Sequence, residues 1–258
     1  RLGRNIKLNG ERQMKIEYDE ISNPGGRPIN EDAYVIVRSE NMIAFAVADG
    51  LGGHGHGEIA SSIAVSAVGD TFKSYNGESQ KTKVTIAFEE AQKRILGQQE
   101  ALNIKNSMKT TLCVLSIEAG CAFWGHIGDS RIYWFRGHKL FKRTLDHSVP
   151  QMLVATGDIK ESEIRHHEDR NRLLRVIGTE WSKPEYELAE QPVRLRPNDK
   201  FLICSDGFWE NVDEKEMAEC MSKAKNATDW LIYMRRILLR KTKNKDNDNF
   251  TAITVWIK

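Results

Sequence analysis

The chain has 258 residues, enough for one large domain or two small ones with a substantial core. Acidic and basic residues nearly balance, at a net charge of +2, so the total charge argues against a nucleic-acid or membrane-surface binder. No apolar run approaches the length of a membrane span, and we expect no signal peptide. The four cysteines form no C-x-x-C pair, which favours buried reduced thiols in the cytoplasm over disulfides or zinc ligands.

The first twelve residues are polar and basic and have no periodicity, so we interpret residues 1–12 as a tail or the end of a linker. No further linker follows. We therefore expect one domain over residues 13–258.

Two acids, Glu31 and Asp32, stand directly before a predicted strand at residues 33–37. A loop at residues 23–28 precedes them and carries Arg27. Acids at a turn are usually just solvated, so this pair alone does not indicate a site.

The strongest local signal is at residues 42–58. Residues 42–48 are an uninterrupted apolar run, typical of a strand buried on both faces, and Asp49 follows directly. Five glycines occupy positions 50, 52, 53, 55 and 57, and a helical pattern begins at Glu58. A buried strand, an acid, a bare loop and a helix together indicate a ligand site.

Two chemistries are compatible with this loop. Gly50, Gly52 and Gly55 satisfy the dinucleotide-binding pattern G-x-G-x-x-G, with Asp70 near the place of the ribose-binding acid. Against this, Asp49 would face a pyrophosphate, and Asp70 continues the helix. A divalent metal ion would instead favour the carboxylate and the exposed backbone carbonyls.

The remaining elements alternate in a way that excludes an all-parallel sheet. Short turns separate the strands between residues 110 and 141, so neighbouring strands should be antiparallel. Strands are predicted at residues 15–21, 110–117, 121–127, 132–135, 139–141, 200–204 and 251–257, and helices at 81–104, 214–221 and 228–240.

Residues 146–178 are more charged and are predicted to be largely helical, with Gly157 as a helix stop. His166, His167 and Arg170 cluster there. A surface helix explains them better than a metal site does.

Three more acids stand at strand ends. Asp129 follows the strand at 121–127, Asp206 precedes Gly207 after the strand at 200–204, and Asp248 lies shortly before the last strand. An EF-hand loop that begins at Asp246 is excluded, because Phe250 occupies its fifth position and no glycine stands at the sixth.

Five carboxylates, from Asp32, Asp49, Asp129, Asp206 and Asp248, would repel one another in a partly dry cleft unless a cation were present. Ligation by oxygen alone favours Mg²⁺ or Mn²⁺ over Zn²⁺. Two such ions about 3.5–4 Å apart would convert a bridging water to hydroxide and orient it for in-line attack. Phosphate-monoester hydrolysis needs help of this kind.

Several short motifs occur in an order that resembles the type 2C metal-dependent serine/threonine protein phosphatases, in particular their bacterial branch. These are Arg27-x-x-Asn30-Glu31-Asp32, Asp49-Gly50-x-Gly52-Gly53-His54, Gly128-Asp129-Ser130-Arg131, Ser205-Asp206-Gly207 and Asp248-Asn249-x-Thr251. Further landmarks are Asp146-His147-Ser148 and Arg170-Asn171-x-Leu173-x-Arg175-x-Ile177-Gly178. The resemblance covers roughly residues 15–258.

The resemblance implies an α+β fold, a four-layer αββα sandwich of two antiparallel sheets with helices on both outer faces, and a flap at about residues 147–184. It implies hydrolysis of phosphoserine and phosphothreonine in proteins. The partners implied are phosphorylated proteins and a serine/threonine kinase, and we expect a monomer that binds neither nucleic acid nor membrane.

The resemblance also implies roles for single residues. Asp49 would bridge two Mn²⁺ or Mg²⁺ ions, the Gly50 carbonyl would complete the shell of one, and Asp206 and Asp248 would hold the other. Glu31 and Asp32 would act largely through bound waters, and Arg27 would grip the substrate phosphate. Asp129, with Asp206, would hold a third, weaker ion.

Two positions depart from the family pattern. Leu51 stands where eukaryotic members of the family carry a histidine thought to protonate the leaving group, so a metal-bound water or His54 must do so here. Glu210 replaces a frequent Asp near the third ion. A catalytically inactive phosphopeptide-binding or scaffold domain is the alternative, which the full set of ligands disfavours. A serine hydrolase is weaker still, because Ser130 lacks the second glycine of a nucleophile elbow.

Overall fold

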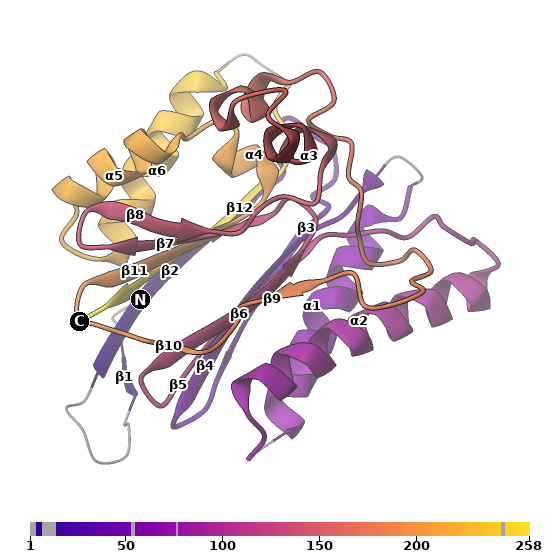
Figure 1. Cartoon of the computed structure of the whole chain (residues 1–258), viewed down its shortest axis with the longest axis horizontal. Helices are drawn as coiled ribbons and strands as arrows, with labels where there is room; N and C mark the ends of the chain where they lie inside the picture. Colours follow the sequence, from indigo (N-terminus) through magenta and orange to yellow (C-terminus); the bar gives the residue numbers. More distant parts are fainter. Residues whose placement is uncertain (1–3, 7–13, 53–54, 76, 244–245) are drawn as a thin grey trace.

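The computed structural model describes residues 4–6, 14–52, 55–75, 77–243 and 246–258. In this part of the chain, two antiparallel sheets pack face to face (Figure 1). The first contains, in spatial order, β1 (Arg4–Ile6), β2 (Met14–Asn23), β12 (Phe250–Ile257), β11 (Asp199–Cys204), β7 (Arg131–Arg136) and β8 (Lys139–Arg143). The second contains β10 (Val193–Arg194), β6 (Cys121–Ile127), β5 (Leu112–Glu118), β4 (Met42–Asp49) and β3 (Asp32–Arg38), with β9 (Glu187–Leu188) also paired to β6.

Helices form the two outer layers. The second sheet is covered by α1 (Gly57–Ser74) and α2 (Gln80–Leu102), and the first by α4 (Asp206–Trp209), α5 (Glu214–Lys223) and α6 (Ala227–Lys241) (Figure 1). The segment between β8 and β9 contains α3 (Val149–Thr156) and the 3₁₀ helix η2 (Glu161–His166). The predicted four-layer α+β sandwich is therefore confirmed.

The central strand β4 shows why the layers form. Ala44, Phe45, Ala46, Val47 and Ala48 are fully buried, so the predicted two-sided burial is confirmed. One face of β4 meets the other sheet, and α1 packs on the opposite face. Apolar side chains on both faces of the strand need a covering layer on each side, because burial of apolar surface stabilises the folded state by about 25 cal/mol for each Å².

The space between the sheets is filled by aromatic rings. Trp134 stacks on Phe201 with the ring centroids 6.0 Å apart, and Trp124 meets Trp134 edge to face. Tyr18 from β2 meets Phe45 from β4, at a centroid distance of 5.4 Å. The Trp124–Trp134 and Tyr18–Phe45 contacts join the two sheets, whereas Trp134 and Phe201 are cross-strand partners within the first sheet.

Helix boundaries follow local signals. The Ser79 hydroxyl accepts a hydrogen bond from Thr82 N at the start of α2, and Asn103 ends that helix in the left-handed conformation with φ 55°. α1 runs through Asp70, so no second strand begins there as a dinucleotide fold would require. The predicted helices at 81–104, 214–221 and 228–240 are α2, α5 and α6.

One prediction is wrong and some elements lie outside the predictions. Residues 167–178 are not helical. The chain is held there by backbone hydrogen bonds from Leu174 N to His147 O and between Ile177 and Thr110, which override the helical pattern. β9, β10 and the single turn α4 are too short to show periodicity, and β1 lies in the stretch predicted to be a tail. The division into tail and domain stays a prediction.

The cysteines are free thiols, and Cys113, Cys204 and Cys220 are buried. Among the described residues, none of the helices combines the length and the apolar character that a membrane span requires.

Candidate metal centre

The predicted site residues gather at one end of the sandwich because the strands that carry them start or stop there. Asp49 ends β4 and Asp32 begins the antiparallel neighbour β3, so the two are cross-strand partners. In the other sheet, Asp206 follows β11 and Asp248 precedes β12. Asp129 lies in the turn that crosses from β6 to β7, and so from one sheet to the other.

Asp32 is held by groups from the opposite sheet. It is 7 % exposed, and its Oδ2 accepts a hydrogen bond of 2.7 Å from the Ser205 hydroxyl. The same hydroxyl accepts a bond from Thr251 N. The second oxygen, Oδ1, is buried without a hydrogen-bond partner among the described groups. A buried carboxylate oxygen without a partner fits a site that takes a ligand from outside the chain.

Asp49 has its backbone fixed on both sides. Its N–H donates to the Thr111 hydroxyl, at 3.0 Å, and its carbonyl accepts bonds from Thr110 Oγ1 and Thr111 N, each 2.9 Å long. The following residue must be glycine, because a Cβ on Gly50 would lie 2.1 Å from the Gly57 carbonyl oxygen. The strand end therefore presents one carboxylate and a bare backbone at a fixed position.

The Asp129 turn is anchored from the helical layer. Trp209 Nε1 donates to the Asp129 carbonyl at 2.9 Å, and the Arg131 guanidinium lies 3.4 Å from the centroid of the Trp209 ring. Arg131 also forms a bidentate ion pair with the buried Asp146. This network leaves the Asp129 side chain free to face the other carboxylates.

Asn249 ties the first acidic motif to the last. Its Oδ1 accepts a bond from Glu31 N at 2.8 Å, and its Nδ2 donates to the carbonyls of Pro24 and Ile29. It is 5 % exposed. The loop that carries Arg27 and Glu31 is thus fastened beside Asp248, although the two are more than 200 positions apart.

A cavity of about 470 Å³ opens among these residues. Its walls include seven of the eight predicted site residues, and the eighth, Asp32, is the cross-strand partner of Asp49 in that wall. Arg27 is the only cation among the described lining residues, and it pairs with Asp248 at 3.3 Å. Asn171 and Leu173 contribute from the predicted flap. The seven are Arg27, Glu31, Asp49, Gly50, Asp129, Asp206 and Asp248.

Burial raises the pKa values of the site carboxylates, and the charges of neighbouring carboxylates raise them further. Burial raises the pKa of Asp32 to about 7, with further contributions from Asp206 and Asp248. Burial followed by the charge of Asp206 raises the pKa of Asp49 and that of Asp129 well above the usual range. The pKa of Asp206 is raised by burial and then by Asp248. A cation would remove this repulsion, so the donor set fits a hard divalent ion.

The two residues that depart from the family pattern, Leu51 and Glu210, both lie at or near the cavity. Leu51 lines the cavity and offers no proton, and His54 lies outside the described residues. Glu210 pairs with Arg170 at 3.0 Å, and burial raises its pKa to about 7. His166 is an exposed residue at the end of η2, and neither it nor His167 belongs to a possible metal-binding group among the described residues.

Sequence and structure comparisons agree with this geometry. Residues 26–245 match the family model described as Protein phosphatase 2C. The chain is 32 % identical over 205 residues to the serine/threonine phosphatase stp of Listeria monocytogenes, which covers 78 % of this chain and 80 % of the relative. Stp1 from Staphylococcus aureus has a crystal structure with a TM-score of 0.85, 25 % identity and coverage of 100 % and 99 %.

A third comparison is with the catalytic domain of the serine/threonine phosphatase PstP in complex with two manganese ions. The TM-score is 0.77, at 24 % identity, with coverage of 95 % of this chain and 99 % of that one. At this identity the likeness concerns the fold.

Fold, site and comparisons define a metal-dependent phosphatase class: the chain belongs to the protein phosphatase 2C family, in its bacterial branch. It is a protein serine/threonine phosphatase.

Proposed function

We propose that the chain hydrolyses phosphoserine and phosphothreonine in proteins with the help of two Mn²⁺ or Mg²⁺ ions at the carboxylate centre. The observation that carries the proposal is the gathering of five aspartates in and beside one cavity, four of which have raised pKa values. Burial is the main cause of these raised pKa values and the charges of neighbouring aspartates add to it, and bound cations would offset both. The PstP catalytic domain, which has the same fold, forms a complex with two manganese ions.

Each side chain has a proposed role. Asp49, the Gly50 carbonyl, Asp206 and Asp248 would hold the two ions, and Asp129 with Asp206 a third, weaker one. Glu31 and Asp32 would orient water around them. When bound, the ions supply an activated water nucleophile near neutral pH and neutralise charge on the phosphate.

Arg27 would bind the substrate phosphate. Its side chain is about half exposed at the mouth of the cavity and pairs there with Asp248. Once Asp248 is engaged by a cation, the guanidinium fork is free to bond two phosphate oxygens. Leu51 cannot protonate the leaving alkoxide, so we propose that water does so.

The flap at residues 147–184 would contact the phosphoprotein beside the phosphate, which is supported by Asn171 and Leu173 in the cavity wall. The substrates would be targets of a serine/threonine kinase. The monomeric state and the cytoplasmic location stay predictions.

The proposal is tested by phosphate release from a phosphothreonine peptide and from an aryl phosphate, with and without Mn²⁺. We expect metal-dependent turnover of both. Binding of the peptide without turnover would support the inactive phosphopeptide-binding alternative, and turnover that does not depend on metal would contradict the carboxylate centre.

A further inference from the structure

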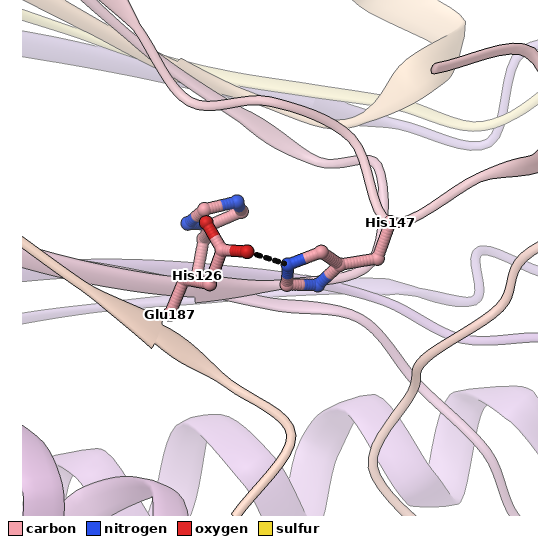
Figure 2. Close-up of side chains that lie close together, drawn as sticks. All are labelled: His126, His147 and Glu187. Atoms are coloured by element: carbon pink, nitrogen blue, oxygen red, sulfur yellow. Dashed lines mark ion pairs between the residues drawn. The ribbon is translucent and has the colours of Figure 1, made fainter. Parts of the chain in front are cut away.

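A second group of metal-ligating side chains lies outside the carboxylate centre. His126 on β6, His147 after β8 and Glu187 on β9 each offer one ligand atom, and these atoms lie within 4.8 Å of one another (Figure 2). His126 and Glu187 are cross-strand partners. The two imidazole rings stack at a centroid distance of 4.8 Å, and no aspartate belongs to the group.

The His126 ring is placed as a metal ligand requires, whereas the His147 ring must move its proton from Nε2 to Nδ1 to bind. His126 is 4 % exposed, and its Nε2 lies 2.7 Å from the Leu145 carbonyl, to which it donates. That bond leaves Nδ1 with the free lone pair, and a backbone carbonyl on the other nitrogen is the usual support of a ligating histidine. Burial lowers the pKa of His126, and burial followed by the charge of His126 lowers the pKa of His147 to about 4. The neutral imidazole is the form that binds a metal ion.

Besides the grouping of the three side chains, the environment of His147 Nε2 also points to a ligand. Its side chain is 6 % exposed, and Nε2 is buried without a hydrogen-bond partner among the described groups. Glu187 Oε1 lies 3.3 Å away, an ion-pair distance without hydrogen-bond geometry (Figure 2). Glu187 itself is half exposed, so a cation can enter from its side.

The spacing suits a tetrahedral ion after a small movement. Two donors each about 2.1 Å from zinc are about 3.4 Å apart, and the ligand atoms lie within 4.8 Å of one another, so a pair must close by at most about 1.4 Å. The His147–Glu187 distance of 3.3 Å already matches. The exposed Glu187 side chain can move, and the two rings must also turn out of their stacked arrangement, with 16° between the ring planes, because the lone pair of a ring nitrogen lies in the plane of its ring.

We propose that His126, His147 and Glu187 form a binding site for a borderline transition-metal ion such as Zn²⁺, separate from the carboxylate centre. Two imidazoles and one carboxylate are a zinc ligand set, whereas Mg²⁺ prefers oxygen ligands in an octahedral shell. The two sites therefore differ in ligand chemistry, with nitrogen and oxygen donors here and oxygen donors alone at the carboxylate centre.

Occupation of this site acts on the Asp129 turn. In the free protein, His147 Nδ1 accepts a hydrogen bond from Gly128 N at 3.2 Å, so the proton of the neutral ring is on Nε2. A metal bound at Nε2 displaces this proton, and a neutral ring then carries its proton on Nδ1, facing the Gly128 N–H. Gly128 loses its acceptor and the turn before Asp129 is released on that side.

One cation opposes binding. Arg175 Nη1 lies 3.5 Å from Glu187 Oε1 and competes for the same carboxylate. Arg175→Gln should therefore tighten zinc binding, whereas Glu187→Gln should weaken it, because the amide removes the only negative charge among the three ligands.

The test is calorimetric titration of Zn²⁺ into full-length protein saturated with Mg²⁺, repeated with Co²⁺ and visible absorption. We expect one equivalent with the intense bands of a four-coordinate site, at least tenfold weaker binding in His126→Gln and Glu187→Gln, and wild-type binding in His138→Gln, an exposed control. Glu187→Gln keeps the test decisive if His126→Gln fails to fold. In an amide NMR spectrum, the Gly128 N–H signal should shift with zinc.

Asp49→Asn separates this inference from the proposed function. It should abolish phosphatase activity yet keep the zinc equivalent. The proposal is overturned if Mg²⁺-saturated protein takes up no Zn²⁺, if uptake persists unchanged in Glu187→Gln, or if Asp49→Asn removes it.

Discussion

Replacement of Asn249 by alanine removes the link between the Arg27 loop and Asp248. The side chain makes three hydrogen bonds, to Glu31 N, the Pro24 carbonyl and the Ile29 carbonyl. At roughly 1 kcal/mol each, their loss should lower the free energy of unfolding by about 3 kcal/mol. For a chain of this size that corresponds to a fall in Tm of roughly 6–12 °C.

The same change should impair substrate binding. Arg27 N donates to the Pro24 carbonyl, which is one of the acceptors that Asn249 holds. Release of that carbonyl lets the turn move, so we expect KM for a phosphothreonine peptide to rise by roughly tenfold, equivalent to about 1.4 kcal/mol. Calorimetric unfolding and steady-state phosphate release measure the two effects.

Asn226→Ala is the matched control, because Asn226 caps α6 through one bond to Asp229 N, away from the cavity. It should lower stability by about 1 kcal/mol and leave KM unchanged. The reasoning is refuted if Asn249→Ala is no less stable than Asn226→Ala, or if its KM equals that of the unaltered protein.

Three further predictions concern the cavity. Arg27→Ala should raise KM for phosphopeptides by roughly 10–100-fold, which corresponds to the loss of a charge-assisted hydrogen bond. Metal affinity should stay near that of the wild type, because the exposed ion pair between Arg27 and Asp248 contributes little. An unchanged KM would show that Arg27 does not bind the substrate phosphate. His54→Ala should leave phosphothreonine turnover nearly intact if water protonates the leaving group, and a selective loss on the peptide with the aryl phosphate spared would identify His54 as the acid. The pKa of Asp32 rises from 3.8 in the unfolded chain to about 7 in the folded protein, so the folded state binds more protons between these two pH values. Metal-free protein should therefore lose stability as the pH rises from 3.8 to about 7, and added Mn²⁺ should reverse the loss. Chemical unfolding measures this stability, and a midpoint that does not change with pH would contradict the prediction.

The sequence predicted the elements whose own residues carry a clear hydrophobic pattern. β4 is an unbroken apolar run and α1 has apolar residues at helical spacing, so both can be assigned from the local sequence. β9 and β10 have two residues each and exist because β6 offers them an open edge, which no local pattern reveals. Residues 167–178 were mispredicted for the same reason, because their backbone partners are Thr110 and His147.

The acids of the site were predictable because each ends or begins a strand, and strand ends converge. The residues that position them were not. Asn249, Thr111 and Trp209 act through hydrogen bonds to groups that are far away in the sequence. The residues next to them in the sequence give no indication of these hydrogen-bond partners. His126 and Glu187 were missed as a pair for the same reason: only the pairing of β9 with β6 brings them together.

The central claim, that carboxylates at the strand ends hold the catalytic ions, is tested most directly by Mn²⁺ titration of wild-type protein and Asp206→Asn with phosphate release followed in parallel. Asp206→Asn keeps the side-chain volume and removes one charge from the ligand set. We expect two equivalents of Mn²⁺ in the wild type, activity that vanishes with a chelator and returns with Mn²⁺ or Mg²⁺, and a variant that stays folded, binds fewer ions and loses orders of magnitude in rate. Full activity in excess chelator, or near-wild-type turnover by Asp206→Asn, would contradict the claim.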